Sequence, residues 1–238
     1  MSDTAGYKRV LLKISGEALL GDRSHGIDPK IIGRLAEEIA TVRARGIALG
    51  VVVGGGNIFR GIEVARSGGN RVTGDQMGML ATVMNALSLR DALMARGLSC
   101  SVFSGIPVPS VCDTFNQRDA QAAFDRGDVV VFAGGTGNPF FTTDSGAALR
   151  AAEMGCDALL KGTQVDGVYS ADPKISSDAT RYDRLSYGEV LERDLRVMDT
   201  AAVAIARDNG IPIVVFSILE AGSLVDVAGG GGLATVVA

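Results

Sequence analysis

The 238-residue sequence predicts an α/β protein, a three-layer sandwich in which helices cover both faces of a mostly parallel central sheet. Short apolar runs alternate along the chain with segments of helical periodicity, which is the pattern of βαβ units. The runs are apolar throughout rather than at every second position, as in parallel strands that are buried on both faces. No linker rich in Pro, Gly or Ser divides the chain, so we expect a single domain over residues 1–238.

The first half of the chain begins with an apolar strand at Val10–Ile14. A helix follows over Pro29–Arg45, where apolar residues recur at helical spacing and proline marks the start. The next buried strand, Leu49–Val53, leads into three glycines. A long helix is predicted over Asp75–Arg96, because its Met and Leu residues recur on one face. A helix this apolar suits a subunit interface, although periodicity alone does not distinguish an interface from core.

The second half of the chain continues the alternation of strands and helices. Apolar runs predict strands at Val102–Phe103, Val129–Phe132, Ala158–Leu160, Ile213–Ser217 and Ala234–Val237, the last as a candidate edge strand. Helical spacing predicts helices at about Arg118–Asp125, Asp144–Met154, Ser186–Glu192 and Asp199–Asp208. Because ligands of such sheets bind at the carboxyl ends of strands, we expect the glycine turns after Val53 and Phe132 at one site.

Composition restricts the range of partners. The formal net charge of −4 argues against a broad basic surface for nucleic-acid polymers, but a local anion site for mononucleotides stays open. The polar N-terminus lacks a hydrophobic signal core, and no apolar run approaches the roughly 20 residues of a membrane span. The three cysteines have no C-x-x-C spacing and are expected to be reduced thiols. We therefore expect a cytoplasmic protein without a membrane or nucleic-acid partner.

The most informative segment lies between Phe132 and Gly146. An apolar strand runs into Gly134–Gly137, where three of four residues are glycine, so backbone N–H groups can approach an anion closely. The Thr-Thr-Asp-Ser sequence that follows opens a helix with hydroxyl groups and free N–H groups. Strand, glycine turn and hydroxyl-rich helix start together predict a phosphate site. The Pro-Phe-Phe sequence in the middle adds more apolar bulk than a phosphate alone requires.

Several familiar nucleotide-binding motifs are absent from the sequence. A P-loop requires a Gly-Lys pair, and the chain contains none. The G-x-G-x-x-G fingerprint does not follow the first strand, and the His-Arg-Asp and Asp-Phe-Gly motifs of protein kinases are missing. The single histidine, His25, lies in a polar loop and is interpreted as a solvated residue rather than an acid or base.

Two of the five lysines end apolar strands. Lys13 and Lys161 each follow three consecutive apolar residues, and a lysine in a buried strand is costly unless it faces an anion or carboxylate. A second glycine turn, Gly54–Gly56, is followed by Arg60, whose guanidinium suits a phosphate. The sequence therefore predicts cations and glycine turns around one anionic ligand.

Five motifs resemble, in order, those of the bacterial uridylate (UMP) kinases of the amino-acid-kinase superfamily. They are Lys13-Ile-Ser-Gly16-Glu-Ala, Val53-Gly-Gly-Gly-Asn-Ile-Phe-Arg-Gly61, Gly74-Asp-Gln-Met-Gly-Met-Leu-Ala-Thr82, Gly135-Thr-Gly-Asn-Pro-Phe-Phe-Thr-Thr-Asp144 and Val165-Asp-Gly-Val-Tyr169. The resemblance runs from about residue 7 to the C-terminus. It implies an amino-acid-kinase-like fold of roughly eight strands, transfer of the ATP γ-phosphoryl group to UMP, and Mg²⁺ as cofactor. A UMP-side lobe over about residues 7–160 and an ATP-side lobe over about 161–238 are expected.

The resemblance also implies a role for each matched residue. On the ATP side, the phosphates would contact Lys13, Ser15, Gly16, Gly56 and Arg60, and the adenosine would contact Thr163, Gln164, Tyr169 and Asp172. Gln164 stands where relatives often carry lysine or asparagine. On the UMP side, the nucleotide would contact Gly55, Asp75, Thr136, Gly137, Asn138, Pro139, Phe140, Phe141, Thr142 and Thr143. Catalysis would depend on Lys13, Arg60, Asp144 and Lys161. No protein ligand of Mg²⁺ is assigned.

Two of these aspartates have a second interpretation. Asp75 follows Thr-Gly at a predicted helix start, so it could be a capping carboxylate rather than a ligand of the ribose hydroxyls. Asp144 could likewise cap its own helix instead of orienting the catalytic lysines. The sequence leaves both alternatives open.

The resemblance further implies a homohexamer that UTP inhibits and GTP activates, with effector residues that the sequence does not identify. Two other functions compete with the uridylate kinase interpretation. A superfamily enzyme acting on a carboxylate or carbamate is one, but acetylglutamate and carbamate kinases lack the Asn-Pro-Phe-Phe-Thr-Thr segment. A non-catalytic nucleotide-binding protein on the same fold is the other, and it predicts loss of Lys13, Asp144 and Lys161, which are all present.

Overall fold

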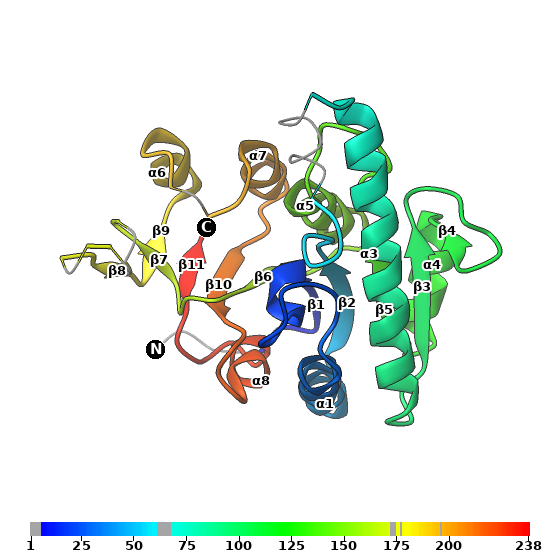
Figure 1. Ribbon diagram of the computed structural model, residues 1–238. Coiled ribbons are helices and arrows are strands. Elements are labelled where there is room, and N and C mark those ends of the chain that lie inside the picture. The colour runs from blue at the N-terminus through cyan, green and yellow to red at the C-terminus, as the bar shows by residue number, and fades with distance from the viewer. Residues whose placement is uncertain (1–5, 61–67, 172–174, 177, 196) are drawn as a thin grey trace.

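The computed structural model describes residues 6–60, 68–171, 175–176, 178–195 and 197–238. Within these residues, a nine-stranded sheet has the order β4-β3-β5-β2-β1-β6-β10-β11-β9 (Figure 1). Its strands are β1 (Arg9–Ile14), β2 (Ala48–Val53), β3 (Cys100–Ser104), β4 (Asp113–Thr114), β5 (Val129–Ala133), β6 (Ala158–Thr163), β9 (Arg184–Leu185), β10 (Ile213–Ser217) and β11 (Thr235–Val237). A separate two-stranded sheet pairs β7 (Val168–Tyr169) with β8 (Arg181–Tyr182).

Every strand pair from β4 to β10 is parallel, and β11 runs antiparallel to β10. The predicted mostly parallel sheet is therefore confirmed, with nine strands rather than about eight. The interpretation of the last strand as an edge strand is wrong, because β9 pairs with the outer side of β11. Strands of two residues, such as β9, carry no periodic signal in the sequence.

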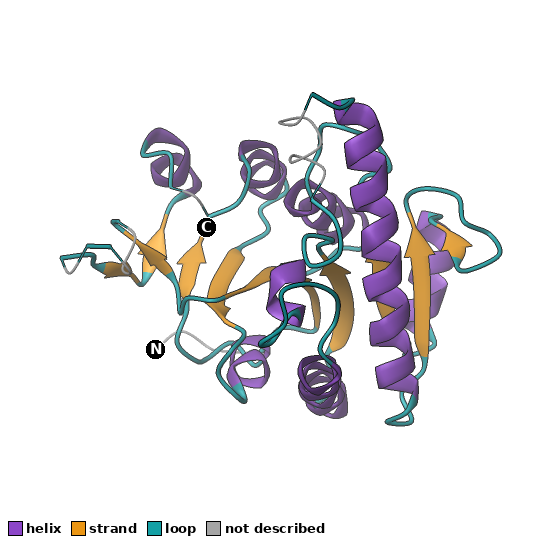
Figure 2. Ribbon diagram, viewed as in Figure 1, coloured by secondary structure: helices purple, strands orange, loops and turns teal. Residues whose placement is uncertain are grey.

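Helices cover both faces of the sheet, as Figure 2 shows. They are α1 (Pro29–Ala44), α3 (Arg71–Met94), α4 (Gln117–Asp125), α5 (Thr143–Glu153), α6 (Tyr187–Glu192), α7 (Thr200–Asp208) and α8 (Ser223–Ala228), with a 3₁₀ turn at Gly16–Leu19. In one core cluster, α1, α3 and α8 pack against one face of the sheet. In a second cluster, α4, α5, α6 and α7 pack against the other face. Neighbouring residues of β1 point to opposite clusters, Leu12 to the first and Leu11 to the second.

The predicted helices lie within a few residues of the observed ones, and the start of α3 differs most. Helix α3 begins at Arg71, four residues before the predicted start, because Asn70 caps it by accepting from the N–H groups of Val72 and Thr73. Helix α8, which the sequence did not predict, begins after Gly222 without a side-chain cap. None of the helices in the described part of the chain is long and apolar enough to cross a membrane.

The centre of the sheet is packed closely around Gly50 of β2. A β-carbon at this position would lie 2.7 Å from Leu11 Cδ1 and 3.2 Å from ring atoms of Phe124 and Phe132. We expect Gly50→Ala to lower the free energy of unfolding by about 1–3 kcal/mol, because the core cannot accept the added methyl group without rearranging. Urea denaturation measures this change.

Gly33, inside α1, is the matched control. A β-carbon there meets only Arg96 Nη2, at 3.5 Å, and alanine is the better helix former. Gly33→Ala should leave stability unchanged or raise it by up to about 1 kcal/mol. Equal effects of the two substitutions would contradict the packing argument.

Candidate active site

Three charged side chains form the centre of the site. Strands β1 and β6 are parallel neighbours whose register places Lys13 opposite Lys161. Between the two ammonium groups lies the carboxylate of Asp144, with Lys13 Nζ 2.6 Å from Oδ1 and Lys161 Nζ 3.0 Å from Oδ2. Lys161 also donates to the carbonyl of Val197. Two cations from adjacent strands therefore share one carboxylate.

The first turn of α5 places this carboxylate. Thr142 is the N-cap and accepts from the N–H of Asp144 at 3.0 Å, so the interpretation of Asp144 as the cap is wrong. The carboxylate of Asp199, which caps α7, accepts from the hydroxyls of Thr142 and Ser145. Asp199 thus joins the ends of two helices beside Lys161.

The electrostatics of the three groups are coupled. Burial alone would raise the pKa of Asp144, but the ammonium groups of Lys13 and Lys161 outweigh burial and hold that pKa below its usual value. Burial lowers the pKa of Lys161, and nearby Lys13 adds to this effect while Asp144 opposes it. Among the three groups, two positive charges face one negative charge, and the nearby carboxylate of Asp199 also acts to raise the pKa of Lys161.

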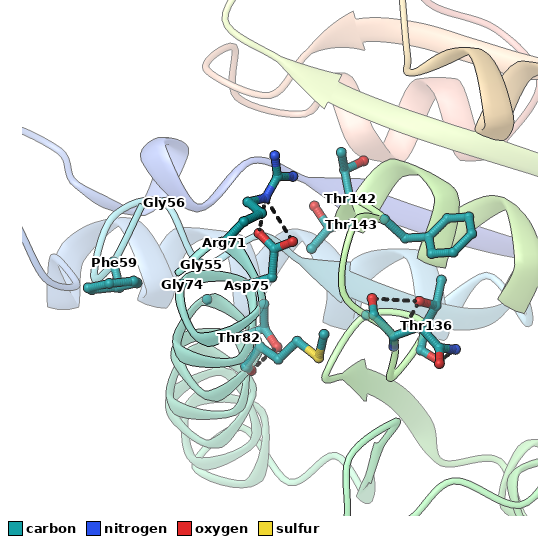
Figure 3. Close-up of a pocket in the computed structure, with 15 residues that line it drawn as sticks. Gly55, Gly56, Phe59, Arg71, Gly74, Asp75, Thr82, Thr136, Thr142 and Thr143 are labelled. Carbon is teal, nitrogen blue, oxygen red and sulfur yellow. Dashed lines mark hydrogen bonds and ion pairs between the residues drawn. The ribbon is translucent and has the colours of Figure 1, made fainter. Parts of the chain in front are cut away.

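A cavity of about 230 Å³ opens between α3 and the β5–α5 loop. In Figure 3, Asp75 and Thr82 of α3 face Thr136, Thr142 and Thr143 across it. Of the residues expected around UMP, the lining contains Gly55, Asp75, Thr136, Asn138, Phe141, Thr142 and Thr143. It also contains Gly56, which was assigned to the ATP side.

Asp75 is not a helix cap either, because Asn70 fills that role. Its carboxylate binds Arg71 Nε through both oxygens, at 2.8 and 2.9 Å, and accepts from the N–H of Phe140 at 2.8 Å (Figure 3 shows the Arg71 pair). Phe140 has a φ of 72°, a left-handed conformation that is costly for a bulky residue. Asp75 therefore fixes a strained point of the loop that carries the Asn-Pro-Phe-Phe segment.

A second cavity, of about 630 Å³, is lined by Lys161, which does not line the first cavity. Its lining mixes apolar and polar side chains. The apolar ones include Val165, Val168, Leu195, Val197 and Val215, and the polar ones Lys161, Thr163, Tyr169, Ser170, Arg193 and Asp194. The Tyr169 hydroxyl donates to Asp166 at 2.7 Å. Because Asp144 follows Thr143 of the first cavity and binds Lys161 of the second, its carboxylate connects the two linings.

The glycine turns and Arg60 lie beside this centre. A β-carbon on Gly16 would lie 2.5 Å from the carbonyl oxygen of Gly54, so the turns after β1 and β2 pack backbone to backbone. Ser15 caps the 3₁₀ turn without a side-chain hydrogen bond. Arg60 pairs with Glu17 at 2.5 Å, and both side chains are nearly half exposed.

Some expected site residues do not line either cavity. Gly137, Pro139 and Phe140 belong to the β5–α5 loop but are absent from the lining, and Phe140 is 66% exposed. Gln164 is exposed and does not line the second cavity. Asp172 lies outside the described residues. His25 is exposed in its loop, as expected.

The structure also adds residues that the sequence did not single out. Arg71, Phe59 and Thr82 line the first cavity, and Arg193 lines the second. Arg71 could have been found, because it stands four residues before Asp75 on one helix. Asp199 gave no such signal, since its partners are more than 50 residues away in the sequence.

Comparison with known proteins agrees with this geometry. The model of the amino acid kinase family matches residues 8–217. The uridylate kinase of Mesorhizobium japonicum is 61% identical over 232 residues, which cover 98% of this chain and 97% of the relative. The chain belongs to the uridylate kinases of the amino acid kinase family.

Solved structures of this family match the fold closely. The UMP kinase of Bacillus anthracis superposes with a TM-score of 0.94 at 38% identity, covering 98% of this chain and 96% of that one. The UMP kinase of Ureaplasma parvum gives a TM-score of 0.92 at 37% identity, with 97% and 98% covered. The uridylate kinase resemblance of the sequence motifs is therefore confirmed over the whole chain.

The coupling of Asp144 to two lysines predicts a pH-dependent contribution to stability. A carboxyl whose pKa is lower in the folded than in the unfolded chain stabilises the fold above its unfolded pKa and loses this effect as pH falls through the folded value. We expect Asp144→Asn to be less stable than the parent at pH 7 by about 3–5 kcal/mol, because two buried cations lose their partner. The difference should shrink below about pH 3.8. Urea denaturation between pH 3 and 7 measures it; a difference independent of pH would contradict the ion-pair explanation.

Proposed function

We propose that this chain transfers the γ-phosphoryl group of ATP to UMP, giving ADP and UDP, in pyrimidine nucleotide biosynthesis. The observation that carries the proposal is the Lys13–Asp144–Lys161 group at the junction of two cavities, in a chain that belongs to the uridylate kinases. In the reaction, a UMP phosphate oxygen forms a bond to the γ-phosphorus, and the bond from that phosphorus to the ADP oxygen breaks.

The assignment of the two cavities follows from the residues that line each of them. We assign UMP to the cavity at Asp75 and the β5–α5 loop, whose lining comes from residues 55–143. The adenosine of ATP is assigned to the larger cavity at Tyr169, whose lining comes from residues 161–215. This division supports a UMP-side lobe over about residues 7–160 and an ATP-side lobe over about 161–238.

The residues present suit the difficulty of this reaction, which is to bring two polyanions together. The attacking phosphate oxygen is already anionic, so no general base is required. Lys13 and Lys161 supply positive charge, and Asp144 fixes their positions. The N–H groups of Gly54, Gly134 and Gly137 are bonded within the protein, so we assign the phosphates to the other N–H groups of the two turns. We assign Arg60 to the ATP phosphates. Its guanidinium pairs with Glu17, so on nucleotide binding it must either leave Glu17 or bind Glu17 and a phosphate together.

Mg²⁺ is proposed as the cofactor that neutralises charge on the ATP phosphates. Among the described residues, no group of three or more His, Cys, Asp or Glu side chains could hold a metal ion. Both oxygens of Asp144 bind ammonium groups, and those of Asp199 accept from the hydroxyls of Thr142 and Ser145. We therefore assign no protein ligand to Mg²⁺, which would be held chiefly by the substrate phosphates and water.

Assembly and regulation form a further part of the proposal. Met77, Leu80 and Met84 are 41–55% exposed and recur at spacings of three and four on the outer face of α3. An apolar stripe of this kind suits contact with a second copy of the chain within a homohexamer. Inhibition by UTP and activation by GTP are proposed without assigned residues, and the cytoplasm is the expected location.

Lys13→Ala tests the chemistry. We expect ADP release with UMP to fall about a hundredfold in kcat, the effect of roughly 3 kcal/mol of lost charge stabilisation, while the protein still folds. Lys30→Ala, which removes an exposed lysine from α1, should keep full activity. The parent chain should release ADP with UMP but not with acetylglutamate or carbamate. If Lys13→Ala keeps the kcat of the parent, this lysine has no role in the mechanism. If the parent chain itself releases no ADP with UMP, the proposed function is wrong.

Asp75→Asn tests the acceptor cavity. We expect the KM for UMP to rise about tenfold or more, because hydrogen bonds to a charged acceptor contribute about 1.5–3 kcal/mol, with little change in the KM for ATP. Asp91→Asn changes an exposed carboxylate on the same helix and serves as the control. Equal effects on both nucleotides would contradict the assignment of this cavity to UMP.

A further inference from the structure

One face of α3 contacts both glycine turns of the site. Asp75, Gly78, Thr82 and Asn85 recur at spacings of three and four residues and therefore share a face of the helix. This face points toward the cavity, as Figure 3 shows for Asp75 and Thr82. Backbone packing adds to the contact, since a β-carbon on Gly55 would lie 2.7 Å from the carbonyl oxygen of Gly78.

Thr82 binds the turn on the acceptor side. Its side chain is buried, and its Oγ1 accepts from the N–H of Gly134 at 2.7 Å while donating to the carbonyl of Met79 at 2.6 Å. Gly134 has a φ of +71° and no room for a β-carbon, which would lie 2.8 Å from Ser104 Oγ. The conformation of this turn thus depends on a hydrogen bond to the helix.

Asn85 binds the turn after β2. Its side chain is fully buried, and Nδ2 donates to the carbonyl of Gly54 at 2.6 Å. Its amide also exchanges two hydrogen bonds with that of Asn57, at 2.7 and 2.9 Å, and Asn57 donates to the carbonyl of Gly26. The side chains of Asn57 and Asn85 are buried, so the bonds between them and the bond from Asn85 to Gly54 are costly to lose.

We propose that Thr82 and Asn85 are positioning residues that fix the separation of the Gly54–Gly56 and Gly134–Gly137 turns through the rigid helix α3. The inference rests on the proposed function, because the two turns face the reacting phosphates in that assignment. Thr82 and Asn85 stand about one helical turn apart, so the helix holds their partners at a fixed distance. Phosphoryl transfer depends on in-line alignment, and a displacement of about 1 Å costs roughly a hundredfold in rate.

Thr82→Val tests the acceptor side, because valine keeps the volume but cannot accept from Gly134. We expect kcat at saturating ATP and UMP to fall at least tenfold, while the Kd of each nucleotide alone stays within about threefold. Thr82→Ser keeps a hydroxyl and should restore kcat to within about threefold of the parent. Thr41→Val is the matched control, since Thr41 makes a similar hydroxyl-to-carbonyl bond in α1 but is exposed and distant from the site.

Asn85→Leu tests the other turn in the same way, and the same loss of kcat without loss of binding is expected. If either variant does not fold, Thr82→Ala and Asn85→Ala, which add no volume, replace them. A lower melting temperature with unchanged kcat, or a defect confined to one KM and recovered at saturation, overturns the proposal. Failure of every variant to fold also overturns it. An inactive parent chain would instead defeat the proposed function, so the two failures are distinguishable.

Discussion

The carboxylate of Asp144 between Lys13 and Lys161 is the interaction on which the site depends. Neither lysine could remain buried in its strand without it, because an unpaired ammonium group is costly in a low-dielectric interior. The pair also leaves an excess of positive charge among the three groups. In the function that we propose, these two ammonium groups would face the nucleotide phosphates.

The sheet provides the geometry for this interaction. Parallel pairing of β1 with β6 aligns Lys13 and Lys161, and the crossover to α5 brings a helix N-terminus toward the same edge. The glycine turns after β2 and β5 lie at that edge because parallel strands end together. The Lys13–Asp144–Lys161 group, both glycine turns and both cavities thus lie at the same edge of the sheet, where the parallel strands end.

Helix α3 has a different role on each of its faces. Its inner face holds the two glycine turns through Thr82 and Asn85, and its outer face presents Met77, Leu80 and Met84 to solvent. A contact between the outer face and a second copy of the chain would involve the same helix that we propose positions the turns. The apolar stripe that we propose for assembly therefore lies on the opposite face of α3 from the residues that we propose align the substrates.

The sequence by itself determined the fold class, the long helices and the family. Continuous apolar runs specify buried parallel strands, and the order of five motifs specifies the family, because both are local features of the chain. It could not decide whether Asp75 and Asp144 cap helices, since the caps are Asn70 and Thr142 and only the backbone geometry identifies them. Nor could it reveal the partners of Asp144, Thr82 or Asp199, which come from segments 17 to more than 100 residues away. Tertiary structure decided these, because long-range contacts are set by strand register and helix packing rather than by neighbouring residues.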